Sequence, residues 1–347
     1  MDTCKILVIG ASGYIGGSVL TTLMNSSHPR IRECEFTALV RHEPQADTLR
    51  RRGINVAMFS GLDDLDRVRE VAARHDIVIN TASTFNTPAA KSIIDGLGDR
   101  KTAAEKQTHL IQTSGTGSLA DRPVSKRFIE TKVFSDKDNI YEYEKYRESI
   151  EPFPQRTTDV TVMEHGENTG VKTYIVMSPT IYGLGSGMIN QKSMQIEALI
   201  RAARDDKYVS VVGSGESEWS HVHIEDIGLL YELLVTRILE GLDLPSNKRG
   251  IYFSETGYES WRAVSEHIAR TGKELGILPS HEIRQITLEE GSIKLIQSME
   301  PDIIELGWAS RSRTKADLSR EIGWKPTKSF SDFLDSFTTL WTEIIKE

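Results

Sequence analysis

The chain has 347 residues, enough for two domains of ordinary size or for one large domain. Its 42 Lys and Arg residues against 50 Asp and Glu residues give a net charge of -8, which disfavours nucleic acid and anionic membranes as main partners. No apolar run reaches the ~18 residues of a membrane helix, and Cys4 and Cys34 alone cannot form a disulfide scaffold.

The first half of the chain alternates short apolar runs with longer helical stretches. The runs are rich in Val and Ile without clean alternation, as expected for strands covered on both faces. They are Lys5–Ile9, Glu35–Val40, Asn55–Phe59, Asp76–Asn80, His109–Thr113 and Lys172–Met177. Helices are predicted between them near 14–25, 45–52, 63–74, 87–105 and 156–168. This alternation predicts an α/β fold with a Rossmann-type, doubly wound parallel sheet.

The rhythm changes after Met177. A glycine-rich loop begins at Gly183, and the pattern then predicts a helix near 190–205, a strand at Val209–Val212 and a largely helical C-terminal part. We expect two interleaved units. An NADP-binding domain would comprise 1–182 plus about 219–253, and a smaller, mostly helical substrate lobe would comprise 183–218 plus about 254–347.

The segment Gly10-Ala11-Ser12-Gly13-Tyr14-Ile15-Gly16 follows the first strand and opens a helix. Gly10 permits a tight turn, Gly13 permits close approach of backbone to a pyrophosphate, and Gly16 lets the helix pack on the strand. The helix N-terminus offers unpaired N–H groups and a partial positive charge to phosphate. We therefore assign these residues to cofactor binding: Gly10, Ser12, Gly13, Tyr14, Ile15 and Gly16.

The end of the second strand indicates which dinucleotide is bound. An acidic residue there would accept a hydrogen bond from the ribose 2′-hydroxyl of NAD, whereas an Arg can pair with the 2′-phosphate of NADP. The strand ends in Val40-Arg41-His42. Arg41, with His42 beside it, favours NADP, and NAD remains the alternative.

The spacing Gly10-x-x-Gly13-x-x-Gly16 resembles that of extended and atypical short-chain dehydrogenases/reductases, the NAD-dependent epimerase/dehydratase group. Further matches follow in chain order at Asn80–Ser83, Gln112–Ser114, Ser178–Gly183 and Leu318–Pro326. The resemblance implies cofactor contacts after the fourth and sixth strands. The residues so assigned are Thr81, Ala82, Ser83, Pro179 and Thr180.

The resemblance also implies a catalytic constellation. In the family, a Tyr acts as general acid and base, a Lys one helical turn later lowers its pKa, and a Ser or Thr hydroxyl polarises the substrate carbonyl. Ser114 or Thr113 matches the hydroxyl. Tyr141-Glu142-Tyr143-Glu144-Lys145 is a literal Tyr-x-x-x-Lys at a suitable distance from Ser114. Tyr182 is a second candidate phenol.

The downstream spacing of Tyr141 and Lys145 fits badly. The catalytic helix of the family runs unbroken to the turn before the sixth strand, but here Pro152 and Pro154 interrupt any single helix. Either residues were inserted after a functional Tyr141/Lys145 pair, or the pair is coincidental and the site is degenerate. The charged surroundings of the pair are equally typical of a solvated amphipathic helix.

Three functions follow. The first is an NADP-dependent oxidoreductase that transfers hydride between the cofactor and a small carbonyl or alcohol metabolite. The second is an epimerase, isomerase, lyase or cyclase without net redox, and the third is a non-catalytic NADP-sensing regulator. We expect a cytoplasmic protein with a small-molecule substrate, no metal, no nucleic-acid or membrane partner, and, as the resemblance implies, a capacity to pair as a homodimer.

Overall fold

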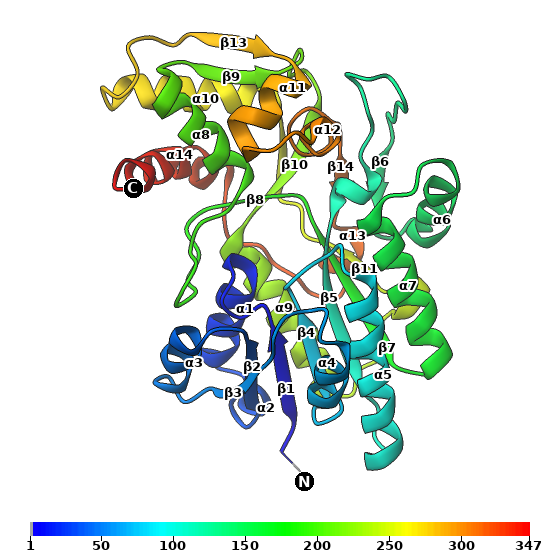
Figure 1. Ribbon diagram of the computed structural model, residues 1–347. Coiled ribbons are helices and arrows are strands. Elements are labelled where there is room, and N and C mark those ends of the chain that lie inside the picture. The colour runs from blue at the N-terminus through cyan, green and yellow to red at the C-terminus, as the bar shows by residue number, and fades with distance from the viewer. Residues whose placement is uncertain (1–2) are drawn as a thin grey trace.

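A seven-stranded parallel sheet lies at the centre of the computed structural model, which describes residues 3–347 (Figure 1). Its strand order is β11-β7-β5-β4-β1-β2-β3. The strands are β1 (Lys5–Ile9), β2 (Glu35–Val40), β3 (Asn55–Met58), β4 (Ile77–Asn80), β5 (His109–Gly115), β7 (Lys172–Ser178) and β11 (Ile251–Phe253). The chain order reverses on either side of β1, and such a switch point opens a crevice at the carboxyl ends of the strands.

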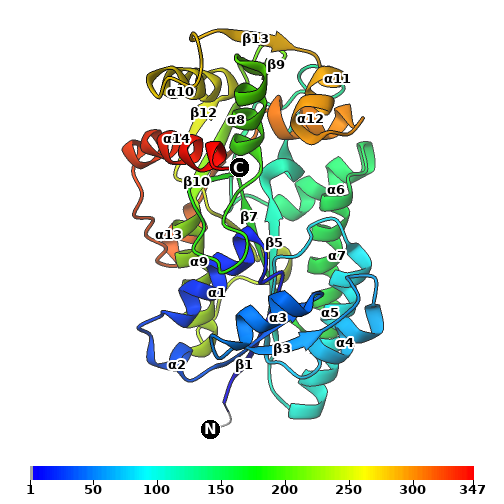
Figure 2. The same ribbon diagram turned by 60° about the vertical axis from the view of Figure 1, so that its left-hand side comes forward.

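Helices cover both faces of this sheet (Figures 1 and 2). On one face, α1 (Tyr14–Met24) packs against α9 (Ile224–Leu239), and α3 (Glu43–Arg50) lies beside β2 and β3. On the other face lie α4 (Leu65–Ala72), α5 (Thr87–Ala104) and α7 (Pro154–Thr169). Because both faces are covered, the central strands are largely buried, and the doubly wound fold predicted from the sequence is confirmed.

The C-terminal part builds a second apolar core, in which Trp261, Trp308 and Trp341 are buried. Its strands are β8 (Thr180–Tyr182), β9 (Val209–Val212), β10 (Glu218–His223), β12 (Gly257–Ser260) and β13 (Ile283–Ile286). Its helices are α8 (Gln195–Asp206), α10 (Trp261–Glu274), α11 (Leu288–Gly291), α12 (Pro301–Trp308) and α14 (Phe330–Ile345). The chain then returns to the central sheet, because Trp324 packs into the core around that sheet. The proposed domain bounds stay a prediction.

The segment 117–155, which shows little regular pattern in the sequence, contains a short strand and one helix and ends at the start of a second helix. After β6 (Val133–Ser135), helix α6 (Ile140–Ile150) begins at Asn139, whose side chain caps the amide of Glu142. Helix α7 then begins at Pro154. The break falls at Pro152, so the prolines separate two helices as predicted.

Candidate functional site

The glycine turn brings β1, α1 and the end of β4 closer together than side chains would allow. Gly10 has φ +89°, and a Cβ atom there would lie 2.6 Å from Thr81 Oγ1. A Cβ atom on Gly16 would lie 2.3 Å from the Gly10 carbonyl oxygen and 2.3 Å from Thr81 Oγ1. Gly13 donates its amide to Gly10 at 2.9 Å and caps α1. The turn therefore presents bare backbone at the N-terminus of α1.

A cleft of ≈ 350 Å³ opens over this turn, at the carboxyl ends of the central strands. It is lined by Gly13, Tyr14, Ile15, Thr81, Pro179, Ile181, Asn190, Lys192, Ser193, Met194 and Gln195. Five residues predicted to bind the cofactor thus lie together. Sequence reasoning missed Asn190 and residues 192–195, for which the glycine-rich stretch after β8 was the available signal.

Tyr14 anchors that stretch to α1. Its hydroxyl donates hydrogen bonds to the carbonyl oxygens of Gly183 at 2.6 Å and Tyr182 at 3.2 Å. Further along α1, the hydroxyl of Thr21 donates to the Ser186 carbonyl, and the amide of Ser186 donates to Ser18 Oγ. The loop is therefore fastened along the helix, and Tyr14 serves as its tether as well as a wall of the cleft.

The predicted residues in the glycine turn and after β4 differ in exposure and in hydrogen bonding. Ser12 is half-buried and Ala82 is exposed. The hydroxyl of Thr81 donates to the Ile9 carbonyl at 2.8 Å, and Ser83 Oγ accepts the amide of Phe85 at 3.1 Å. The two hydroxyls are thus already engaged with the backbone.

Thr180 and Tyr182 face away from the cleft. Because side chains alternate along a strand, Pro179 and Ile181 point into the cleft and these two point into the second core. Tyr182 is 1% exposed, and its hydroxyl has no hydrogen-bond partner among the described residues. The ring of His221 lies 5.5 Å from its ring. The structure therefore does not bring Thr180 or Tyr182 to the cleft.

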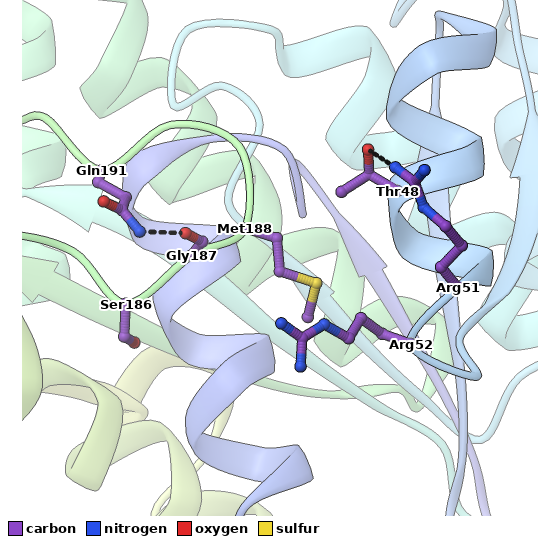
Figure 3. A pocket seen from close by; sticks show the side chains of 7 residues that line it. All are labelled: Thr48, Arg51, Arg52, Ser186, Gly187, Met188 and Gln191. Atoms are coloured by element: carbon purple, nitrogen blue, oxygen red, sulfur yellow. Dashed lines mark hydrogen bonds between the residues drawn. The ribbon is translucent and has the colours of Figure 1, made fainter.

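Arg41 and His42 lie exposed directly after β2, where His42 precedes α3. Two further arginines, Arg51 and Arg52, border a separate cavity of ≈ 450 Å³ between the end of α3 and the loop after β8 (Figure 3). Figure 3 shows Arg52 extending toward Met188. This second cavity shares no lining residue with the cleft.

The two hydroxyls at the end of β5 point to opposite faces of the sheet. Thr113 Oγ1 lies 2.5 Å from the hydroxyl of Tyr231 on α9. Ser114 Oγ donates to Asp159 Oδ2 on α7 at 2.6 Å. The register pairs Ser114 with Met177, two residues before Pro179 of the cleft lining, and Ser114 itself is 3% exposed.

Tyr141 and Lys145 lie together on α6 and share one partner on α7. The Tyr141 hydroxyl donates to Glu164 Oε1 at 2.7 Å, and Lys145 Nζ lies 2.8 Å from the same oxygen. The hydrogen bond to Glu164 raises the pKa of Tyr141 to about 12. The structure thus joins Tyr141 and Lys145 to Glu164, whereas Ser114 is joined to Asp159. Their catalytic role stays a prediction.

The helix that runs directly into β7 is α7, and it contains neither Tyr nor Lys. Its face toward β5 carries Gln155 and Asp159, one turn apart. The amide of Gln155 lies 2.9 Å from where a Cβ atom of Gly115 would stand. Sequence reasoning missed both residues. The available signal was Asp159 itself, an acidic residue on a helix side that also carries Val162 and Met163.

Two other kinds of feature are absent from residues 3–347. No group of three or more His, Cys, Asp and Glu side chains is arranged to hold a metal ion. No helix in this range has both the length and the apolar character needed to cross a bilayer.

Comparison with known proteins agrees with this architecture. The oxidase ucsJ of Acremonium sp is 28% identical over 340 residues, covering 93% of each chain. The dTDP-glucose 4,6-dehydratase DesIV of Streptomyces venezuelae, solved with NAD and TYD, superposes with a TM-score of 0.67 at 15% identity, covering 98% of this chain and 97% of that one. The UDP-glucuronic acid 4-epimerase of Bacillus cereus superposes with a TM-score of 0.64 at 14% identity, covering 98% of this chain and 99% of that one. These two structures share the fold.

The family comparison is more specific. Residues 6–242 match the family described as the NAD dependent epimerase/dehydratase family. This range contains the glycine turn, the end of β4, Ser114 and the link between β7 and β8, so the match covers the whole cleft. The chain therefore belongs to the NAD dependent epimerase/dehydratase family, a family of enzymes.

Proposed function

We propose that the protein is an NADP-dependent oxidoreductase that interconverts a small alcohol and its carbonyl compound. The observation that carries this proposal is the ≈ 350 Å³ cleft over the glycine turn, at the switch point of the sheet. The bare backbone at Gly10 and Gly16 fits a dinucleotide, since it leaves the N-terminus of α1 open to a pyrophosphate. The Acremonium relative, named an oxidase, supports the same class of reaction.

In this proposal the bound nicotinamide accepts or supplies the hydride, and the protein binds, orients and moves one proton. Gly13 and the first turn of α1 would hold the pyrophosphate, and Pro179 would lie beside the nicotinamide. Ser114 forms a hydrogen bond with the substrate oxygen. Tyr141 and Lys145 are the alternative candidates for the general acid and base. We rank them lower because their hydrogen bonds are directed to Glu164.

Turnover tests this function. Incubation with NADPH and a panel of small aldehydes and ketones is expected to consume the nicotinamide absorbance. Tyr141→Phe is expected to leave turnover nearly unchanged, because the phenol is bonded to Glu164 and its pKa is raised to about 12. The matched control is Tyr146→Phe on the same helix, where the side chain is 55% exposed. A large loss confined to Tyr141→Phe would restore the rival pair.

Cofactor preference forms a second test. Arg41→Ala is expected to weaken NADPH binding by roughly tenfold, the worth of one charge-assisted hydrogen bond, and to leave NADH binding unchanged. Arg51→Ala, which borders the separate cavity, serves as the control. Titration by nicotinamide fluorescence measures both affinities. Equal losses for the two cofactors, or none, would argue against a 2′-phosphate contact at Arg41.

A second candidate keeps the fold and drops net redox. The absence of Tyr and Lys from α7 favours it, and the solved relatives that share the fold are a dehydratase and an epimerase by name. Product formation without a change in nicotinamide absorbance would identify such an epimerase, isomerase, lyase or cyclase. Tight NADP binding without any product, together with a co-purifying protein, would instead identify a sensing regulator.

We also propose a small-molecule substrate, a cytoplasmic location and pairing as a homodimer. The free state of Cys4 and Cys34 supports a reducing compartment. Sedimentation equilibrium of the purified protein measures the oligomeric state, and a mass that stays monomeric at high concentration would exclude the homodimer.

A further inference from the structure

A cluster of buried charged and hydroxyl side chains lies between β5, α6 and α7, directly behind Ser114. Asp159 on α7 and Glu144 on α6 are both 0% exposed. Asp159 Oδ2 accepts hydrogen bonds from Ser114 Oγ at 2.6 Å and Ser118 Oγ at 3.1 Å. A buried cluster of this kind is costly unless its charges are compensated, so the number of protons it holds matters.

Glu144 has no hydrogen-bond donor among the described residues, which favours its protonated form beside Asp159. Neither carboxyl oxygen of Glu144, nor Oδ1 of Asp159, accepts an N–H or a side-chain hydroxyl within the described chain. An ionised Glu144 would therefore be a buried charge without a donor. When protonated, Glu144 donates a hydrogen bond to Asp159. The pair then carries at most one negative charge.

The surrounding groups compensate only part of that charge. The positive charge of Arg156 acts on both acids, but its N–H groups are directed to the Ser118 carbonyl at 2.8 Å and to Glu148 Oε2 at 3.2 Å. Burial raises the pKa of Asp159 to about 7, although Ser114, Ser118, Glu144 and Arg156 act to lower it. Burial, and the charge of Asp159, raise the pKa of Glu144 well above its usual value.

We propose that Asp159 takes up and returns the proton of the reaction through the hydroxyl of Ser114, with Glu144 as its positioning residue. The inference rests on the proposed function. In alcohol oxidation the substrate O–H bond breaks, its proton passes to Ser114 Oγ, and the Ser114 proton passes to Asp159 Oδ2. The carbon-bound hydrogen leaves with its electron pair to the nicotinamide named above, so the alcohol is oxidised and the cofactor reduced.

This route follows from the position of Asp159. Ser114 lies at the carboxyl end of β5, the edge of the sheet where the cleft opens, and its hydroxyl donates to Asp159. A group that titrates near neutral pH is suited to general acid and base work, whereas a phenol whose pKa is raised to about 12 is not. Asp159 also lies on the helix that runs directly into β7.

The first arm of the test needs no cofactor or substrate. Infrared difference spectra of the ligand-free protein are recorded at pH values from roughly 5.5 to 8.5, on both sides of the expected titration. We expect one protonated carboxyl band that disappears as the pH rises through about 7. Asp159→Asn is expected to remove this band. The matched control is Asp95→Asn, whose carboxylate pairs with His165 at the other end of α7.

The second arm measures turnover against pH. Oxidation needs ionised Asp159, so the wild-type kcat is expected to rise with pH through the same titration, and carbonyl reduction is expected to fall. Asp159→Asn is expected to lower kcat by about tenfold or more and to flatten the profile, without weakening NADPH binding. Asp95→Asn is expected to keep the wild-type profile.

The outcomes separate the two proposals. A carboxyl band that still titrates through about pH 7 in Asp159→Asn, or a variant with the wild-type kcat and pH profile, would overturn the Asp159 route and leave the oxidoreductase standing. A wild-type protein that binds NADPH but converts no substrate would overturn both. A kcat loss in a variant that keeps the wild-type pH profile would reduce Asp159 to a structural role.

Discussion

Replacing Gly16 with alanine is expected to weaken dinucleotide binding by about 100-fold, equivalent to ~2.8 kcal/mol. The added Cβ atom would stand 2.3 Å from both the Gly10 carbonyl oxygen and Thr81 Oγ1, a distance that no packed atoms tolerate. The first turn of α1 would have to move away from β1 and β4, and its N–H groups would move with it. NADPH fluorescence titration measures the loss.

The control for this variant is Gly307→Ala in α12, where an added Cβ atom meets nothing within 4 Å. Alanine there should leave affinity unchanged, since it introduces no clash and favours the helix. Circular dichroism confirms that both variants are folded. Wild-type affinity in folded Gly16→Ala would contradict the assignment of the turn to the cofactor.

Removing the carboxylate of Asp136 is expected to lower the free energy of unfolding by about 3 kcal/mol or more. Asp136 is 5% exposed and follows β6. It accepts the backbone amides of Leu318 at 2.6 Å, Ser319 at 3.1 Å and Phe253 at 3.1 Å. Asp136→Ala leaves these three buried donors unpaired, and so separates β6 from β11 and from helix α13 (Asp317–Glu321).

Urea unfolding followed by tryptophan fluorescence measures this effect. Asp136→Asn is expected to lose less, about 1 kcal/mol, because its amide oxygen still accepts from the backbone. Asp335→Ala, at an exposed position on α14, is the control and should change the free energy of unfolding by less than about 0.5 kcal/mol. Equal stability of Asp136→Ala and Asp335→Ala would contradict the structural role.

Much of the fold was predictable because its signals are local. The apolar runs at Lys5–Ile9, Glu35–Val40 and Val209–Val212 form strands with those bounds. Each is a short apolar segment beside a turn, and this local pattern is sufficient to predict a strand that is buried on both faces. The glycine turn was equally predictable, because the backbone conformation at Gly10 and the close packing of Gly16 against the turn require glycine at fixed positions in one segment.

The candidate site residues were less predictable because their contacts are remote in sequence. Ser114 and Asp159 meet across 45 residues, and no spacing rule links a strand end to a position on a helix that begins after a proline break. The literal Tyr141-x-x-x-Lys145 motif satisfies a local rule, yet its helix is a separate one. Only packing decides that Glu164 lies opposite it.

The sequence by itself determined the parallel sheet, the glycine turn and the family, because these depend on local patterning and on glycines that no other residue can replace. The tertiary structure alone decided which hydroxyl of β5 faces α7, which side of β8 faces the cleft, and which acid lies buried behind Ser114. Those choices depend on the direction of side chains between segments far apart in the chain, and packing sets that direction.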